Sequence, residues 1–200
     1  MKKTLLIIFL LFALNSCTNT NRPAPKVPQI KYATSIGKLS SIKYSQDIYV
    51  NYINQVRAKG AVCAPPAPPL KNNYYLERAA FAHANDMATN HFLSHTGSGT
   101  KTDPARKALG IGSIFFERVL FFGYPAKKYD LVGENITYIK DSIVSSKKKF
   151  ESFKKAIDVF LKDPPHCKIL MEPRFKDVGV GYKSDGKGLY WVIDFGETTK

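Results

Sequence analysis

The sequence predicts an α+β domain, and three patterns in the chain indicate this fold class. Residues 73–90 carry apolar side chains at intervals of three and four, which is typical of an amphipathic helix. Residues 178–183 and 189–195 instead alternate and contain β-branched and aromatic residues. The glycine-containing segment 184–188 can join these two strands as a hairpin.

The chain begins with Lys2, Lys3 and an apolar run over residues 4–14, which is too short to span a bilayer permanently. We therefore expect a signal peptide over residues 1–16. Leu14-Asn15-Ser16-Cys17 resembles a bacterial lipobox, so Cys17 is expected to carry lipid such as palmitate. The alternative is an ordinary signal followed by an unmodified cysteine. Lipidation predicts an extracytoplasmic, membrane-anchored lipoprotein on the periplasmic or surface face of the cell envelope.

Two segments follow the signal peptide. Residues 17–45 are rich in Asn, Thr, Pro, Lys and Ser, so we expect a flexible tether. Residues 46–200 suit a single domain with one core, because they contain no internal repeat and no second long apolar run.

The first half of this domain reads as two helices separated by a proline-rich loop. A helix is expected over residues 47–59, ending at Gly60, and an extended loop over residues 64–69. A second helix is expected over residues 73–90. His83 falls within the apolar stripe of this helix, so we expect a hydrogen-bonded core histidine instead of a ligand.

The second half begins with a loop over residues 97–112, which has room for one helical turn. Residues 114–122 predict a buried helix, with an exposed aromatic lip as the alternative. The buried helix would share one face among Phe115, Phe116, Val119 and Leu120. A strand near residues 134–139 and an amphipathic helix over residues 147–162 complete the α+β pattern.

The chain is strongly basic. Its formal charge of +14 becomes +12 once Lys2 and Lys3 are removed with the signal peptide. Such a surface attracts anionic phospholipids, wall polymers or nucleic acid. Nucleic acid is disfavoured because no binding module is recognisable and the protein is expected to be exported. The lysines of residues 147–155 have helical spacing, which favours a solvated face, and we expect a monomer.

Three cysteines occur in the chain. If Cys17 carries lipid, Cys63 and Cys167 remain as an even pair in an oxidising compartment, which predicts a disulfide. Closing a loop of about 100 residues contributes on the order of 4–5 kcal/mol in the chain-entropy model. Metal ligation by these cysteines is weakly indicated, because they are far apart and form no Cys-x-x-Cys motif.

Four short patches together suggest a site. They are Leu93-Ser94-His95-Thr96-Gly97, Gly133-Glu134-Asn135-Ile136, Asp163-Pro164-Pro165-His166-Cys167, and Gly179-Val180-Gly181 with Tyr190-Trp191. Two histidines and two carboxylates could form a metal or acid–base site. Taken alone, His95 could be a surface histidine and Glu134 a carboxylate that ties a loop to backbone amides.

In this order the patches resemble the CAP superfamily of cysteine-rich secretory, antigen 5 and pathogenesis-related 1 proteins. The resemblance is to the bacterial, secreted SCP-like branch and covers roughly residues 49–196. It implies a three-layer α/β/α sandwich. It also implies a cavity in which His95, Glu134 and His166 could hold a divalent metal, zinc or magnesium, with Asp163 in the place of a second glutamate.

Asp163 has two possible roles that carry equal weight. Pro164 and Pro165 end the preceding helix, and a new short helix could begin with Asp163 as its N-cap and Pro164 at its first position. Because Pro165 has no N–H, the cap oxygen could reach only the amide of His166. The other role is a ligand in the cavity.

The function that we favour from the sequence is a binding module for a lipid, a cell-wall polymer or a partner protein. The alternative is a metal-assisted hydrolase, and a third possibility is a purely structural set of polar residues. Ser94 lacks the Gly-x-Ser-x-Gly surroundings of a serine nucleophile, and the chain has no His-Glu-x-x-His motif, so protease activity is disfavoured.

Overall fold

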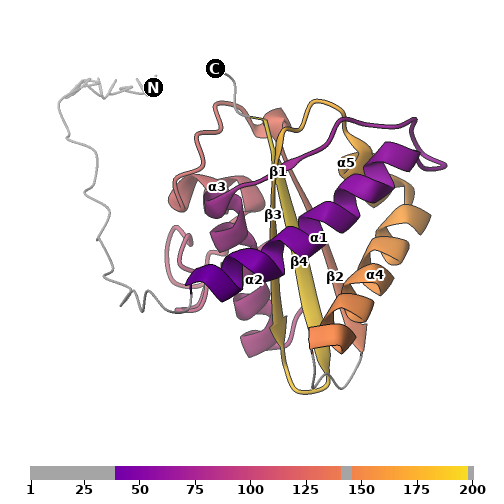
Figure 1. Ribbon diagram of the computed structural model, residues 1–200. Coiled ribbons are helices and arrows are strands. Elements are labelled where there is room, and N and C mark those ends of the chain that lie inside the picture. Colours follow the sequence, from indigo (N-terminus) through magenta and orange to yellow (C-terminus); the bar gives the residue numbers. More distant parts are fainter. Residues whose placement is uncertain (1–38, 141–145, 198–200) are drawn as a thin grey trace, which may run out of the picture. The chain divides into compact units, whose positions relative to one another are not determined.

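A computed structural model describes residues 39–140 and 146–197, apart from the side chains of residues 39–47, 130, 146 and 147. In chain order the elements are α1 (Leu39–Lys59), β1 (Lys71–Asn72), α2 (Tyr74–Asn90), α3 (Phe115–Phe121), η2 (Tyr129–Leu131), β2 (Val132–Lys140), α4 (Ser146–Lys162), α5 (Pro164–Met171), β3 (Asp177–Ser184) and β4 (Gly188–Gly196). They form a four-stranded sheet in the order β1-β3-β4-β2 with helices on both faces (Figure 1). The predicted α+β class and its three-layer α/β/α sandwich are confirmed.

The sheet is mostly antiparallel. β4 lies between β3 and β2 and pairs antiparallel with both, while the two-residue β1 pairs parallel with β3. The β3–β4 hairpin predicted at residues 184–188 is present, and both strands extend one residue or more beyond the predicted bounds. In this pairing Glu134 of β2 stands directly opposite Asp194 of β4.

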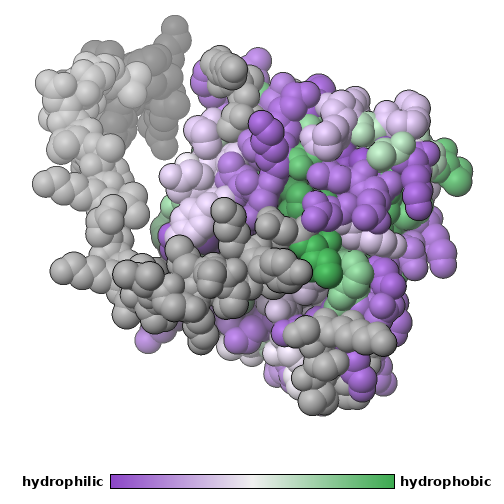
Figure 2. Space-filling view, viewed as in Figure 1, coloured by the Kyte–Doolittle hydropathy of each residue, from purple (hydrophilic) through white to green (hydrophobic). Residues whose placement is uncertain are grey.

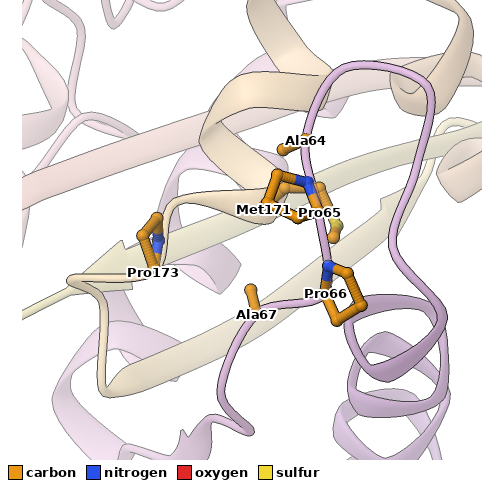
Figure 3. Close-up of a pocket in the computed structure, with 6 residues that line it drawn as sticks. All are labelled: Ala64, Pro65, Pro66, Ala67, Met171 and Pro173. Atoms are coloured by element: carbon orange, nitrogen blue, oxygen red, sulfur yellow. The ribbon is translucent and has the colours of Figure 1, made fainter.

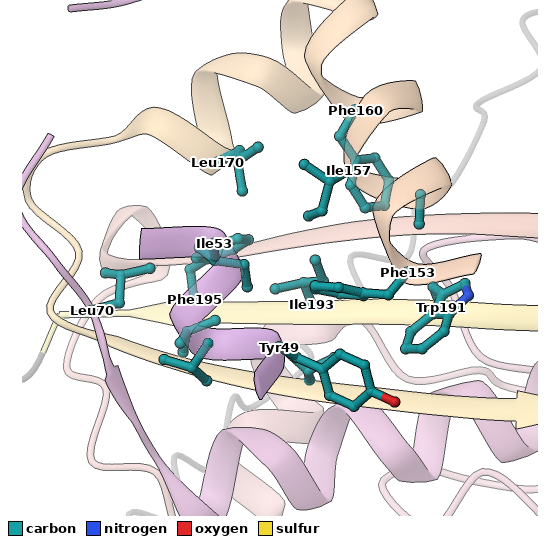
Figure 4. Packing of buried hydrophobic residues seen from close by; sticks show 14 of the residues in the cluster. Tyr49, Ile53, Leu70, Phe153, Ile157, Phe160, Leu170, Trp191, Ile193 and Phe195 are labelled. Atoms are coloured by element: carbon teal, nitrogen blue, oxygen red, sulfur yellow. The ribbon is translucent and has the colours of Figure 1, made fainter. Parts of the chain in front are cut away.

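One face of the sheet supports the larger core, built with α1, α4 and α5. Its side chains come from every second residue of β3 and β4 and from the inner faces of the helices (Figure 4), including Tyr49, Ile53, Phe153, Ile157, Phe160, Leu170, Val178, Val180, Trp191, Ile193 and Phe195. The indole N–H of Trp191 donates to Ser152 Oγ at 3.0 Å, so its one polar atom is satisfied inside the core.

The opposite face is covered by α2, which lies against the backbone of β3. A Cβ placed on Gly179 would lie 2.0 Å from the amide nitrogen of Glu77, and one on Gly181 would lie 2.2 Å from that of Phe81. Two glycines two residues apart on one strand face therefore let the helix approach this closely. α2 begins where Asn73 Oδ1 accepts from Tyr75 N, and it ends at His91, whose φ of 54° is left-handed.

Several elements differ from the sequence-based prediction. α1 begins at Leu39 instead of Asp47, so residues 39–45 of the expected tether are helical. No proline or glycine interrupts residues 39–46, and the helix continues through them. β1 was not predicted, because two residues show no periodicity. Leu120 was expected on the buried face of a helix but is exposed. In the seven-residue α3, only Arg118 and Val119 are buried.

A disulfide and the buried side chain of Arg57 hold together the end of the molecule that carries the 64–69 loop. Cys63 and Cys167 form the predicted disulfide, with a Cα–Cα distance of 6.1 Å. Beside it, residues 64–67, Met171 at the end of α5 and Pro173 just after this helix line a small apolar pocket of about 90 Å³ (Figure 3). The pocket lies apart from the four predicted site residues, none of which lines it.

None of the helices in residues 39–140 and 146–197 is both long enough and apolar enough to cross a bilayer. The predicted signal peptide, Cys17 and residues 18–38 of the predicted tether lie outside the described residues.

Candidate functional site

His95 is carried by the loop that follows α2, and two buried aspartates hold this loop. Asp86 accepts hydrogen bonds from Ser98 Oγ at 2.6 Å, from Thr102 Oγ1 at 2.5 Å and from the amide of Ser98 at 2.8 Å. Asp103 accepts from the amide and the hydroxyl of Ser113 at 2.8 and 2.6 Å. The predicted loop over residues 97–112 is thus ordered by side-chain hydrogen bonds, and the expected helical turn does not form there.

Glu134 lies near the start of β2 and is buried, with a residue exposure of 2%. Its Oε1 accepts a hydrogen bond from His95 Nδ1 at 2.8 Å, and its Oε2 accepts from Arg118 Nη2 at 2.7 Å. Both oxygens of this carboxylate are therefore occupied by side chains of the protein. The carboxylate fixes the ring of His95 instead of facing a ligand.

The charge state of Glu134 follows from its surroundings. Burial alone would raise the pKa of this carboxyl, but the guanidinium of Arg118 and the hydrogen bonds from His95 and Arg118 outweigh burial and lower the pKa to about 2. Glu134 is therefore ionised at neutral pH and forms a buried ion pair with Arg118.

Arg118 connects Glu134 to the loop of His95. Its Nη2 also donates to the backbone oxygen of His95 at 2.8 Å, and its Nη1 donates to the backbone oxygen of Ser113 at 2.7 Å. The guanidinium thus holds His95 by its main chain while Glu134 holds the same residue by its ring. This double attachment leaves the imidazole little freedom to turn.

His166 is held in a matching way from the other side of the sheet edge. Its Nδ1 donates to the carboxylate of Asp163, three residues earlier, and its backbone oxygen accepts from Asn135 Nδ2 at 3.0 Å. The next residue, Cys167, is fixed by the disulfide to Cys63. His166 lies in the first turn of α5, which begins at Pro164. A helix start at this position was one of the two predicted alternatives for Asp163.

The two imidazoles face each other. Their ring centres are 6.1 Å apart and their planes differ by 26°. The side chains of His95 and His166 are 49% and 28% exposed, so both are open to solvent. Because each Nδ1 donates to a carboxylate, the neutral form of each ring carries its free lone pair on Nε2.

The four predicted residues therefore meet as two histidine–carboxylate pairs. Asp163 stands at the N-cap position of α5, but its side chain makes no capping bond and instead binds the ring of His166. Within the described part of the chain, no three His, Cys, Asp or Glu side chains converge as metal ligands. The chemistry of the donor set fits a metal through two imidazole nitrogens, with the carboxylates behind them.

Two other polar residues, His83 and Ser94, lie near the site. His83 is buried, as expected for a core histidine, and its Nε2 donates to the backbone oxygen of Ser94 at 2.7 Å. The hydroxyl of Ser94 accepts from the amide of Thr96 at 3.0 Å. Ser94 is thus part of a local turn.

Three residues of the site escaped the sequence-based prediction. Arg118 was read as part of an apolar run, although a charged residue inside such a run is itself a signal of a buried ion pair. Asn135 was noted only as part of a patch. Asp194 is buried opposite Glu134, and neither of its oxygens has a hydrogen-bond partner among the described residues. Burial and the charge of Glu134 raise the pKa of Asp194 well above its usual value.

Comparison with known proteins identifies the family of this α/β/α sandwich domain. The chain matches the cysteine-rich secretory protein family, CAP, over residues 50–195. The chain therefore belongs to the CAP family. None of the curated proteins searched matches it.

Solved structures that share the fold include the following two. An extracellular protein with an SCP domain from Bacillus anthracis is 20% identical with a TM-score of 0.54, and the match covers 84% of this chain but 45% of that protein. An outer surface protein from Borrelia burgdorferi is 16% identical with a TM-score of 0.56, and the match covers 78% of this chain and 95% of that protein.

Proposed function

We propose that the chain is an extracytoplasmic binding module, anchored to a membrane through lipid on Cys17, whose ligand contacts the His95–His166 pair. The observation that carries this proposal is the pair of facing imidazoles, each oriented by a carboxylate on Nδ1 and open to solvent. Each free Nε2 can accept a hydrogen bond from a hydroxyl or amide of a lipid headgroup, a wall polymer or a partner protein.

A divalent ion would give the same site a second mode of binding, in which the imidazoles of His95 and His166 would hold it. Imidazole nitrogen suits zinc, whereas magnesium prefers oxygen ligands, so zinc is the ion that fits this donor pair better. With two ligands from the protein, the remaining positions are left to water or to an oxygen of the ligand. Glu134 and Asp163 would act behind the metal by orienting the rings.

Binding is favoured over hydrolysis by what the carboxylates do. Glu134 has both oxygens engaged and is neutralised by Arg118, so it is poorly suited to activate a water molecule. The other carboxylate, Asp163, is engaged with His166. Metal-assisted hydrolysis therefore stays the alternative, because neither carboxylate is placed to activate a water molecule.

The histidine pair is tested by calorimetric titration with Zn²⁺ and by capture of lipid extracts and cell-wall fragments. His95→Ala and His166→Ala are expected to weaken zinc binding by more than about tenfold. The matched control is His91→Asn, which changes an exposed histidine outside the site and suits its left-handed backbone. Circular dichroism checks that each variant is folded.

Two results would contradict the proposed site. One is zinc binding that persists in the folded His95→Ala/His166→Ala double variant. The other is capture of lipid or wall fragments that the double variant retains in full. The class of material captured by the unmodified protein and lost by the double variant identifies the ligand class.

The anchor is tested separately. Mass spectrometry of the protein extracted from its own membranes is expected to find acyl chains on an N-terminal Cys17. Cys17→Ser is expected to release the protein into the soluble fraction. An unmodified Cys17 in the membrane-extracted protein would refute lipidation while leaving the histidine site untouched.

A further inference from the structure

Exposed aromatic side chains gather where the start of α2 meets the end of α3. Tyr74 and Tyr75 are 62% and 43% exposed, and Phe121 is 39% exposed. Together with the partly buried Phe122 and with Arg78, we define these residues as the aromatic face. Leu120 on α3 and Ile114 just before it are exposed as well. The aromatic lip that the sequence offered as an alternative is thus present, and it extends onto α2.

Contacts between the rings make this face continuous. Tyr74 and Tyr75 have ring centres 5.7 Å apart, and those of Phe121 and Phe122 are 5.2 Å apart. The guanidinium of Arg78 bridges the two pairs, lying 5.6 Å from the ring centre of Tyr74 and 5.0 Å from that of Phe122. Side chains of two helices therefore form one surface of alternating aromatic and cationic character.

The segment that follows α3 adds basic residues to this side of the helix. Lys127 and Lys128 are exposed on the segment that follows α3. Next to them, the exposed Tyr129 packs on Phe115 and Phe116 with ring-centre distances of 4.8 and 5.6 Å. The acidic residue of α3, Glu117, is engaged by Lys107 at 2.6 Å. Positive charge thus stands beside apolar surface here.

The outer face of α4 provides a comparison. It also carries lysines, but Val159 is the large apolar side chain that is exposed in the described part of this helix. The surface seen around α1 and α4 is mostly hydrophilic (Figure 2). Lysines alone indicate a solvated face, whereas lysines interleaved with exposed Tyr, Phe and Leu are the composition of a membrane–water interface.

We propose that the aromatic face docks on the surface of an anionic bilayer, with the rings at the headgroup level and Arg78, Lys127 and Lys128 near lipid phosphates. Exposed tyrosines have an apolar body and a polar tip, which suits this depth. The net charge of the chain, +14 in full and 14 − 2 = +12 without Lys2 and Lys3 of the predicted signal peptide, favours an anionic surface over a neutral one. The docking uses neither His95 nor His166, so it is independent of the ligand proposed for the histidine pair.

Tryptophan fluorescence can read this contact directly in the full chain. The sequence has one tryptophan, Trp191, which is fully buried in the core and provides an internal baseline. We would compare Phe121→Trp with Val159→Trp, which places the same probe on an exposed site of α4. Vesicles would contain phosphatidylglycerol and brominated phosphatidylcholine, or brominated phosphatidylcholine alone.

Docking predicts a blue shift and quenching for Phe121→Trp on the anionic vesicles, with little change for Val159→Trp or the unmodified chain. The readout is contact with lipid and not attachment, so a lipid on Cys17 does not by itself produce it. Equal quenching at both positions, or none at position 121 in vesicle-bound protein, overturns the proposal. Protection of position 121 by a soluble protein instead of lipid also overturns it.

Charge reversal then tests the basic part of the face. In the Phe121→Trp background, Lys127→Glu/Lys128→Glu is expected to weaken the vesicle-dependent quenching on the order of tenfold or more, and 0.5 M salt is expected to act in the same direction. The control is Lys183→Glu/Lys187→Glu, on exposed positions at the β3–β4 hairpin, away from α3 (Figure 1). Equal loss in both double variants would show a non-specific charge effect and refute docking by this face.

Discussion

Two arginines, Arg57 and Arg118, are fully buried, and they hold different ends of the domain. Arg57 donates to the backbone oxygens of Pro68, Leu170 and Glu172 at 2.9, 2.6 and 3.1 Å. It thereby joins the end of α1 to the proline-rich loop and to the end of α5. Arg118 binds a carboxylate, that of Glu134, as well as the backbone of the His95 loop.

The difference lies in what neutralises each charge. Burial lowers the pKa of Arg57 to about 10, and the nearby Glu172 only partly offsets this, because its carboxylate binds Arg174. Arg57 is thus a set of donors for carbonyls that would otherwise be unsatisfied. Arg118 instead keeps a second charge ionised inside the protein and in position. The contacts of Arg57 therefore stabilise the fold, whereas those of Arg118 also orient the side chain of His95 through Glu134.

The largest expected effect is at the Arg57 end, on removing the disulfide. Cys63→Ser/Cys167→Ser is expected to lower the free energy of unfolding by on the order of 4–5 kcal/mol, because the bridge closes a loop in the unfolded chain. The bridge spans a sequence separation of 104 residues. The loss is measured by denaturant unfolding, and the unmodified protein with reductant is the matched control.

Because this effect acts mainly through the unfolded state, the folded variant is expected to keep its zinc affinity. A loss below about 1 kcal/mol would mean that the unfolded chain is already compact. A folded variant that does not bind zinc would contradict the view that the disulfide and the histidine site act independently. It would show that the position of His166 depends on the disulfide at Cys167.

The next effect is at the other end. Arg118→Met is expected to cost about 3–5 kcal/mol of stability, because it leaves the Glu134 carboxylate buried without its partner. It is also expected to abolish zinc binding, since His95 loses an anchor on its main chain. Denaturant unfolding and calorimetry measure the two losses.

A double-mutant cycle with Glu134→Gln gives the control. Arg118→Met/Glu134→Gln is expected to recover part of the stability, because no charge is then left unpaired, while zinc binding stays lost. Additive losses from the two substitutions would contradict the ion pair as the source of the effect.

A smaller effect is expected for Arg57→Met. Methionine retains an apolar stem but removes donors to three carbonyls, which predicts a loss of about 2–3 kcal/mol. In contrast to Arg118→Met, zinc affinity is expected to stay within about twofold of the unmodified protein, because no site residue contacts Arg57. A large drop in affinity in the folded variant would show that the two ends are coupled.

Much of the fold was predictable because it follows from periodic patterns. The stripe on α2, the alternation on β3 and β4, and Asp163–Pro164 as the start of α5 are local signals, and the structure confirms them. The start of α1 and the two-residue β1 were not predictable in this way. Neither has a sharp boundary signal in the sequence.

The candidate site was predictable only in part, for a physical reason. Motifs identified the two histidines and their carboxylates, but not which atoms meet. The pairing of Glu134 with Arg118 depends on how α3 packs beside β2. The two residues are 16 positions apart in the sequence, and no periodic pattern connects them. The same holds for Asn135, whose contact with the backbone of His166 requires the whole sheet edge to be in place.

The smallest predicted effect concerns the buried residue His83. Burial lowers the pKa of His83 in the folded protein, with only partial compensation from the charge of Glu134. The unfolded chain binds a proton on the same residue near pH 6.5, so stability is lost as pH falls through this value and is retained above it. Each unit by which the pKa of folded His83 lies below that of the unfolded residue contributes about 1.4 kcal/mol to this pH dependence.

His83→Gln is expected to remove this pH dependence, because glutamine can still donate to the backbone oxygen of Ser94 but cannot bind a proton. Denaturant unfolding of both proteins at several pH values measures the difference, and subtraction cancels the histidines that they share. A difference independent of pH would mean that folded His83 is protonated like the unfolded residue. It would then be a charged partner of Glu134, and the Arg118 end would hold one more charge than the structure indicates.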